Sequence, residues 1–124
     1  MLTHTQPMAF LGTTKPEESR SFYEDTLGLE FVEDGPFALV FNLNGTPLRI
    51  QKIEALAPPQ HTNLGWVVDD IAAKVDALAA RGVTFARYDH MEQDARGIWT
   101  TPSGAKVVWF YDPCGNNLSL TQEP

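Results

Sequence analysis

The chain has 124 residues and a formal net charge of −7 at pH 7, because 16 acidic side chains outnumber 9 basic ones. This length suits one compact domain, and the acidic excess argues against nucleic-acid binding, which relies on Lys and Arg. No apolar run approaches the ~20 residues that cross a bilayer, and one cysteine, Cys114, cannot form an intrachain disulfide. We therefore expect a cytoplasmic protein with neither nucleic-acid nor membrane partners.

The first half of the chain predicts the order strand, helix, strand, strand, strand. Apolar residues 8–13 predict a strand, and a helix then begins with Thr14 as N-cap, an early Pro and a Glu three residues after the cap. Gly28 ends this helix. The inward stripe of the helix is Ser19, Phe22, Tyr23 and Leu27. Turn residues such as Asn44-Gly45 separate the strands that follow, which are expected at 29–32, 37–43 and 47–53.

The second half repeats this order. Residues 63–68 predict a strand, and Asp69-Asp70 can cap a helix that ends at Gly82. The stripe of this helix is Ile71, Val75, Leu78 and Ala79, and the strands after it are expected at 83–85, 97–101, 106–111 and 117–122. The linker 55–60 contains Pro58-Pro59. We therefore predict an α+β fold made of two βαβββ modules, about 8–54 and 62–122, within a single domain.

Two segments of the chain resemble a known family. The string TTKPEESRSFYEDTLGLEFV is similar to the first helix and second strand of the vicinal oxygen chelate superfamily, which groups glyoxalase I, bleomycin-resistance proteins and extradiol dioxygenases. The string DPCGNNLSL resembles the turn and strand near the end of that fold. The resemblance covers residues 8–122. It implies that each module curls its sheet into half of an open barrel, with helices outside and a ligand cavity inside, and that a homodimer forms.

The same resemblance predicts where a metal would be held. Metal-dependent members of the superfamily use one side chain from the first and one from the last strand of each module, mostly His or Glu. These positions fall on Met8, Gln51, Asn63 and Ser119. Thioether, amide and hydroxyl groups are poor ligands for such ions, so we expect no metal and no cofactor. A shift of register that brings in His61 leaves the metal-dependent enzyme open.

Alternation along the strands predicts the side chains that face the cavity. If Ser119 faces inward, Leu118 and Leu120 pack against a helix. On the strand 106–111 we favour the set with Trp109 over the set with Phe110, because Trp and Tyr suit a ligand-lined wall. The candidate ligand-binding residues are Phe10, Arg49, Gln51, Asn63, Trp109, Tyr111 and Ser119.

Two features of this set leave alternatives open. Arg49 can bind an anionic ligand group or form a salt bridge at the rim. Tryptophans at strand spacing can stack on an aromatic ligand or belong to the core, and the candidates are Trp66, Trp99 and Trp109. The charged stretch 88–94 is expected to be a mobile, solvated loop over the cavity mouth.

The function predicted from these residues is binding of a small molecule without metal, similar to the antibiotic-sequestering branch of the superfamily. The alternative is a metal-dependent lyase, isomerase or dioxygenase. A third hypothesis is a metal-free enzyme that uses His90 or Tyr111 as acid or base, and His90 is the best candidate for a general base because its unperturbed pKa is near neutrality.

Overall fold

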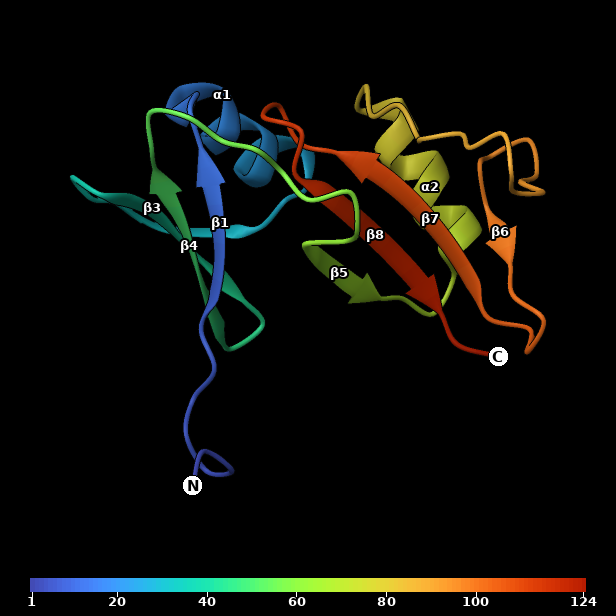
Figure 1. Ribbon diagram of the computed structural model, residues 1–124, viewed down its shortest axis with the longest axis horizontal. Helices are drawn as coiled ribbons and strands as arrows, with labels where there is room; N and C mark the ends of the chain where they lie inside the picture. Colours follow the sequence, from blue (N-terminus) through green and yellow to red (C-terminus); the bar gives the residue numbers. More distant parts are fainter. The chain divides into compact units, whose positions relative to one another are not determined.

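The computed structural model describes all 124 residues. The chain divides into two compact units, residues 1–57 and 58–124, each built on a four-stranded sheet (Figure 1). The elements of unit 1 are β1 (Ala9–Thr13), α1 (Pro16–Ser21), the π-helical segment η1 (Phe22–Thr26), β2 (Glu30–Asp34), β3 (Ala38–Leu43) and β4 (Thr46–Lys52). The elements of unit 2 are β5 (Leu64–Val67), α2 (Ile71–Ala80), β6 (Trp99–Thr100), β7 (Lys106–Tyr111) and β8 (Asn117–Gln122). Neither helix is long and apolar enough to span a bilayer.

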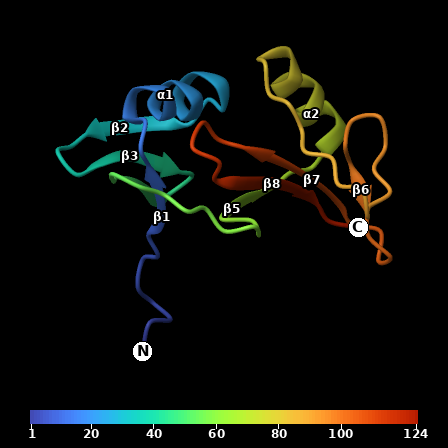
Figure 2. The same cartoon turned by 45° about the horizontal axis from the view of Figure 1, so that its top comes forward.

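The two sheets have the same topology. Their strand orders are β1-β4-β3-β2 and β5-β8-β7-β6, and in each sheet the first strand pairs in parallel with the last. The other neighbours are antiparallel. Figure 2 shows that the helix of each unit lies on one face of its sheet. The predicted internal repeat and the α+β class are therefore confirmed.

The first helix begins one residue later than the sequence predicts. Its N-cap is Lys15 rather than Thr14, and the side chain of Lys15 makes no capping hydrogen bond. Thr13 fixes the start of the helix instead. Its Oγ1 accepts the backbone N–H of Lys15 at 2.9 Å and shares a buried hydrogen bond of 2.7 Å with the hydroxyl of Ser19. The Pro at the first helical position has no N–H that would require an acceptor, so the helix starts there without a side-chain cap.

After one and a half turns this helix widens. The N–H of Leu27 donates to the carbonyl of Phe22 at 2.9 Å, a five-residue spacing that defines the π-helical segment. The widened turn places Tyr23 in the core, where its ring lies 5.9 Å from that of Phe41. Gly28 then adopts a φ of 71°, so the predicted end of the helix is confirmed.

The core of unit 1 lies between the helical segments and one face of the sheet. Register pairs Leu11 with Ile50 and Ile50 with Leu39, and cross-strand partners point to the same face. All three are buried. Phe41 and Leu48 form the next buried row. This face is the one that the alternation of apolar residues predicts.

In unit 2, α2 begins where predicted, because the carboxylate of Asp70 accepts the N–H of Ala73 at 3.1 Å. Ile71 and Val75 of its predicted stripe are buried. The core residues of the sheet alternate toward the same face and are Val108, Phe110, Leu118 and Leu120.

The strand expected at 83–85 does not form. Phe85 makes one isolated antiparallel bridge to Phe110, and β6 is only two residues long. The N–H of Val83 instead donates to the carbonyl of Leu78, and the N–H of Ala86 donates to the carbonyl of Trp109 at 2.8 Å. The segment therefore meets β7 only at Phe85 and Ala86, which is too short a contact for a strand.

Candidate functional site

Each sheet has one face against its helix and one face without a helix, which we call the open face. On unit 1, register places Phe10, Arg49 and Val40 in one row of this face. Gln51 lies in the next row, between Gly12 and Ala38. The three unit 1 residues predicted to face a ligand therefore share one face, opposite the core.

The open face of unit 1 is partly apolar and has one cation without a partner. Phe10 is 53 % exposed, whereas Arg49 is half-buried and makes no ion pair or hydrogen bond. Within unit 1, Arg49 therefore forms no rim salt bridge. Ile53 and Leu56 cover the first strand, because a Cβ at Gly12 would lie 2.7 Å and 3.1 Å from their respective Cδ1 atoms.

On unit 2 the favoured orientation of β7 is the observed one. Trp109 pairs with Ser119, and Tyr111 pairs with Asn117, so these four side chains lie on the open face. Phe110 is fully buried on the other face. Trp66 pairs with the core residue Leu120, so among the three tryptophans it belongs to the helix-covered face.

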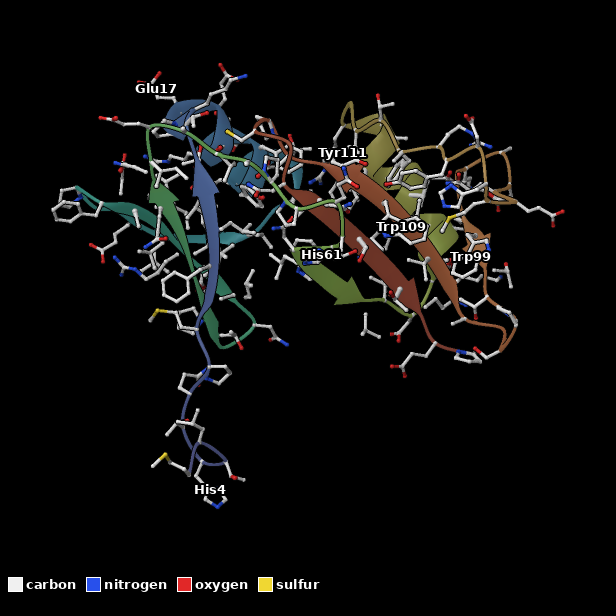
Figure 3. All side chains as sticks on the ribbon, in the orientation of Figure 1. His4, Glu17, His61, Trp99, Trp109 and Tyr111 are labelled. Atoms are coloured by element: carbon white, nitrogen blue, oxygen red, sulfur yellow. The ribbon has the colours of Figure 1, made fainter.

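Four aromatic side chains line this open face, and we call them the aromatic wall. They are Tyr88, Trp99, Trp109 and Tyr111 (Figure 3 labels the last three). The ring of Trp109 lies 6.2 Å from that of Trp99 and 5.7 Å, edge to face, from that of Tyr88. The hydroxyls of Tyr88 and Tyr111 are 2.8 Å apart. The wall is continuous, because each member contacts the next.

Polar groups of β5 and β8 lie beside the wall. The N–H of Asn63 donates to the carbonyl of Asn117 at 2.7 Å, and the Oδ1 of Asn63 accepts the N–H of Asn117 at 2.9 Å. These two bonds fix the register of β5 at Asn63, and His61 stays exposed outside the strand. The side-chain Oδ1 of Asn117 has no hydrogen-bond partner although this residue is only 2 % exposed.

Ser119 lies opposite a glycine. It is 6 % exposed, and a Cβ at Gly65 would lie 2.8 Å from its Oγ. A larger residue at Gly65 would therefore cover this hydroxyl. Because the residue is a glycine, no side chain lies over Ser119 Oγ from this strand.

The open face of unit 2 has no charged side chain on its strands. Its strand residues are Gly65, Val67, Trp99, Val107, Trp109, Tyr111, Asn117, Ser119 and Thr121. Burial raises the pKa of Tyr88 to about 12, and the hydrogen bond to Tyr111 adds to this shift, while the side chain of Asn117 acts in the opposite direction. The phenol of Tyr88 is therefore uncharged at neutral pH.

The loop that brings Tyr88 to the wall is held by hydrogen bonds, while its charged side chains Asp89, Glu92 and Asp94 are exposed to solvent as predicted. The side chain of Gln93 accepts the N–H of Tyr88 at 2.7 Å and donates to the carbonyls of Ala86 and Gly97 at 2.9 and 2.8 Å. Arg87 donates to the carbonyl of Asp94 at 2.8 Å. A half-buried glutamine thus replaces the missing strand pairing as the organiser of this loop.

His90 and Cys114 lie apart from any catalytic arrangement. His90 is exposed, with its ring 5.9 Å from that of Tyr88. Cys114 belongs to a turn that Asp112 holds, because the carboxylate accepts the N–H groups of Cys114 and Asn116 at 2.8 and 2.9 Å. The motif DPCGN is therefore explained by turn geometry.

The residues at the predicted metal positions do not fit a divalent ion. Neither unit contains a group of three or more His, Cys, Asp or Glu side chains that could hold one. The Oδ1 of Asn63 is already used by the backbone of Asn117, and Met8 precedes β1 with only a thioether to offer. We derive no metal chemistry for these positions.

Two residues of the site were not among the sequence candidates. Tyr88 lies in an irregular loop, 23 residues before its partner Tyr111, and no periodicity points to it. Asn117 has a usable signal, because strand alternation places it on the same face as Ser119. Only the structure brings Tyr88 to the site, whereas strand parity already predicts that Asn117 lies on this face.

Comparison with known proteins now gives the family. The profile of the Glyoxalase/Bleomycin resistance protein/Dioxygenase superfamily matches residues 2–120. The chain belongs to this superfamily, and its sheets have the open, curved α+β architecture of the vicinal oxygen chelate fold. The resemblance seen in the sequence is confirmed. No curated protein matches the chain significantly.

Several solved structures share the fold. A superfamily member from Sphaerobacter thermophilus is 25 % identical, with 99 % of this chain and 100 % of that chain covered and a TM-score of 0.75. TnmS3, an antibiotic binding protein from a Streptomyces species, is 24 % identical, with 100 % and 99 % covered and a TM-score of 0.75. A lactoylglutathione lyase from Agrobacterium tumefaciens is 21 % identical, with 95 % and 93 % covered and a TM-score of 0.66.

Proposed function

We propose that this protein binds a small molecule without a metal ion and sequesters it, as an antibiotic or another toxic compound would be sequestered. The aromatic wall of unit 2 is the observation that carries this proposal. Ligand sites are lined mainly by apolar and aromatic side chains with a few polar groups that orient the ligand. The wall and its neighbours Asn117 and Ser119 match that composition.

Two further observations support binding rather than metal chemistry. The positions that hold a metal in enzymes of the superfamily carry Met8, Gln51, Asn63 and Ser119, none of which is a strong ligand. A structure of the same fold is that of an antibiotic binding protein. The lyase from Agrobacterium tumefaciens shares the fold as well, but no residue of this chain favours its activity over binding.

We also propose that the protein acts as a homodimer. Large apolar side chains stand exposed on both units, with Phe37 78 % and Val67 69 % exposed. Contact with a second copy of the chain would remove these side chains from water. We choose a second copy of the chain as the partner, because it is present wherever the protein is.

Indole NMR signals provide the test of ligand binding. The chain has three tryptophans, of which Trp99 and Trp109 lie on the open face and Trp66 on the core face. We expect that titration of the labelled protein with fluorene, 9-fluorenone and tetracycline, quinolone and anthracycline antibiotics yields at least one binder. Such a compound should shift the signals of Trp99 and Trp109 and leave that of Trp66 in place.

Matched variants make the test specific. Trp109→Phe should weaken binding about tenfold, because it removes part of the stacking surface, worth about 1 kcal/mol or more. Trp66→Phe, which changes the same residue type on the opposite face, should leave the affinity unchanged. A panel without any binder, or equal losses in both variants, would argue against the aromatic wall as the site. Stoichiometric Ni, Zn, Mn or Fe after dialysis would contradict the metal-free assignment.

A further inference from the structure

The hydroxyl pair at the end of the aromatic wall is the most specific polar feature of unit 2. Tyr111 comes from β7 and Tyr88 from the loop that Gln93 anchors, and their oxygens lie 2.8 Å apart. Tyr88 is half-buried, whereas Tyr111 is 44 % exposed. The pair therefore has an inner and an outer member.

The geometry leaves one O–H of the pair free. The two oxygens are close enough for one hydrogen bond, and either hydroxyl can be its donor. Two hydroxyls carry two protons, so one O–H remains for another molecule. Tyr111 is the exposed member and is the one that a ligand reaches: when an acceptor meets it, Tyr88 donates to Tyr111 and Tyr111 donates to the acceptor.

The Tyr111 hydroxyl is an uncharged hydrogen-bond donor. The strands of this open face carry no charged side chain. A hydroxyl that accepts one hydrogen bond also donates more strongly, because linked bonds polarise one another. The group that fits beside this O–H is an acceptor oxygen, and the group that fits beside the ring of Trp109 is a flat aromatic system.

We propose that the Tyr88–Tyr111 pair selects uncharged, flat aromatic ligands that carry a carbonyl oxygen at their edge. The O–H of Tyr111 donates to that oxygen while the ring of the ligand packs on Trp109. This inference rests on the proposed function and narrows its ligand class. Tyr88 acts as a positioning residue, because it touches Tyr111 rather than the ligand.

Fluorene and 9-fluorenone test the selection, because they share one flat frame and differ in the carbonyl. The wild type should bind 9-fluorenone about five- to tenfold more tightly, which is the effect of about one net hydrogen bond. In Tyr111→Phe the affinity for 9-fluorenone should fall to that for fluorene, whose own affinity stays the same. Fluorene-9-carboxylate should bind more weakly than either, because the strands of this face carry no cation to pair with its charge.

Two variants complete the design. Tyr88→Phe should reduce, but not abolish, the preference for 9-fluorenone over fluorene. Tyr111 remains in this variant but loses its hydrogen bond to Tyr88. Tyr23→Phe, which removes a hydroxyl from the other unit, should keep the full preference, with folding checked on the same spectra. Equal affinities of the wild type for fluorene and 9-fluorenone, with Trp99 and Trp109 shifted, would overturn the selection and leave small-molecule binding standing. If neither compound moves those signals, the wall itself fails as the site.

Discussion

The phenol of Tyr88 is the clearest example of how one residue depends on its surroundings. Its pKa of about 12 results first from burial and then from the hydrogen bond to Tyr111. A phenol whose folded pKa lies above its unfolded value of about 10 stabilises the fold fully below pH 10. We expect this contribution to be lost as the pH rises from about 10 to about 12.

Residue-resolved titration measures this directly. With ¹³C-labelled tyrosine, the Tyr88 signal of the wild type should titrate near pH 12, and in Tyr111→Phe its midpoint should move part of the way toward 10, because the hydrogen bond to Tyr111 is gone while burial remains. A Tyr88 midpoint that is the same in both proteins would mean that the hydroxyl pair does not form in solution.

The element that depends most on a single side chain is the loop between α2 and β6. Gln93 supplies three hydrogen bonds to backbone groups that no strand satisfies. Gln93→Glu keeps the shape of the side chain and the oxygen that accepts the N–H of Tyr88. It replaces the NH₂ group, which donates to two carbonyls, with an oxygen that those carbonyls repel. We expect the free energy of unfolding to fall by about 2–3 kcal/mol at pH 7, the cost of buried groups left unpaired.

Urea unfolding at two pH values tests this anchor. Protonation of the new carboxyl restores a donor, so Gln93→Glu should recover part of its stability at pH 4 relative to the wild type. Glu92→Gln, the reverse exchange at the adjacent exposed residue, should change stability by less than about 0.5 kcal/mol. Equal effects of the two variants would show that the loop is not held by Gln93.

The strands with clear alternation were predictable from the sequence, and the loop was not. The pattern of β7 and β8 identifies Trp109 and Ser119 as face-mates because the side-chain period is a local property of a strand. Tyr88 and Gln93 act through partners that only the folded chain brings near. The strand expected at 83–85 is reduced to one bridge to β7, because an apolar run does not specify how many of its residues pair with a neighbouring strand.

At the scale of the whole molecule, one topology is used twice and given two different open faces. On its open face unit 1 presents Arg49 without an ion-pair partner, whereas the strand residues on the open face of unit 2 carry no charge. In both units the core lies on the opposite face of the sheet, where Leu48 and Leu118 are fully buried. The open faces are thus free to vary without loss of the core, which is how one fold serves several functions.

The proposed homodimer makes a prediction about the apolar part of the unit 1 face. Phe10→Lys places a charge at a half-exposed apolar position next to Arg49, so it should weaken self-association at least tenfold if a second copy covers this face. Ser21→Lys adds the same charge on the exposed surface of α1 and should leave association unchanged. Sedimentation velocity across a concentration series separates the outcomes. A wild type that stays monomeric at high concentration contradicts the dimer itself, whereas a dimer untouched by Phe10→Lys places its interface elsewhere on the chain.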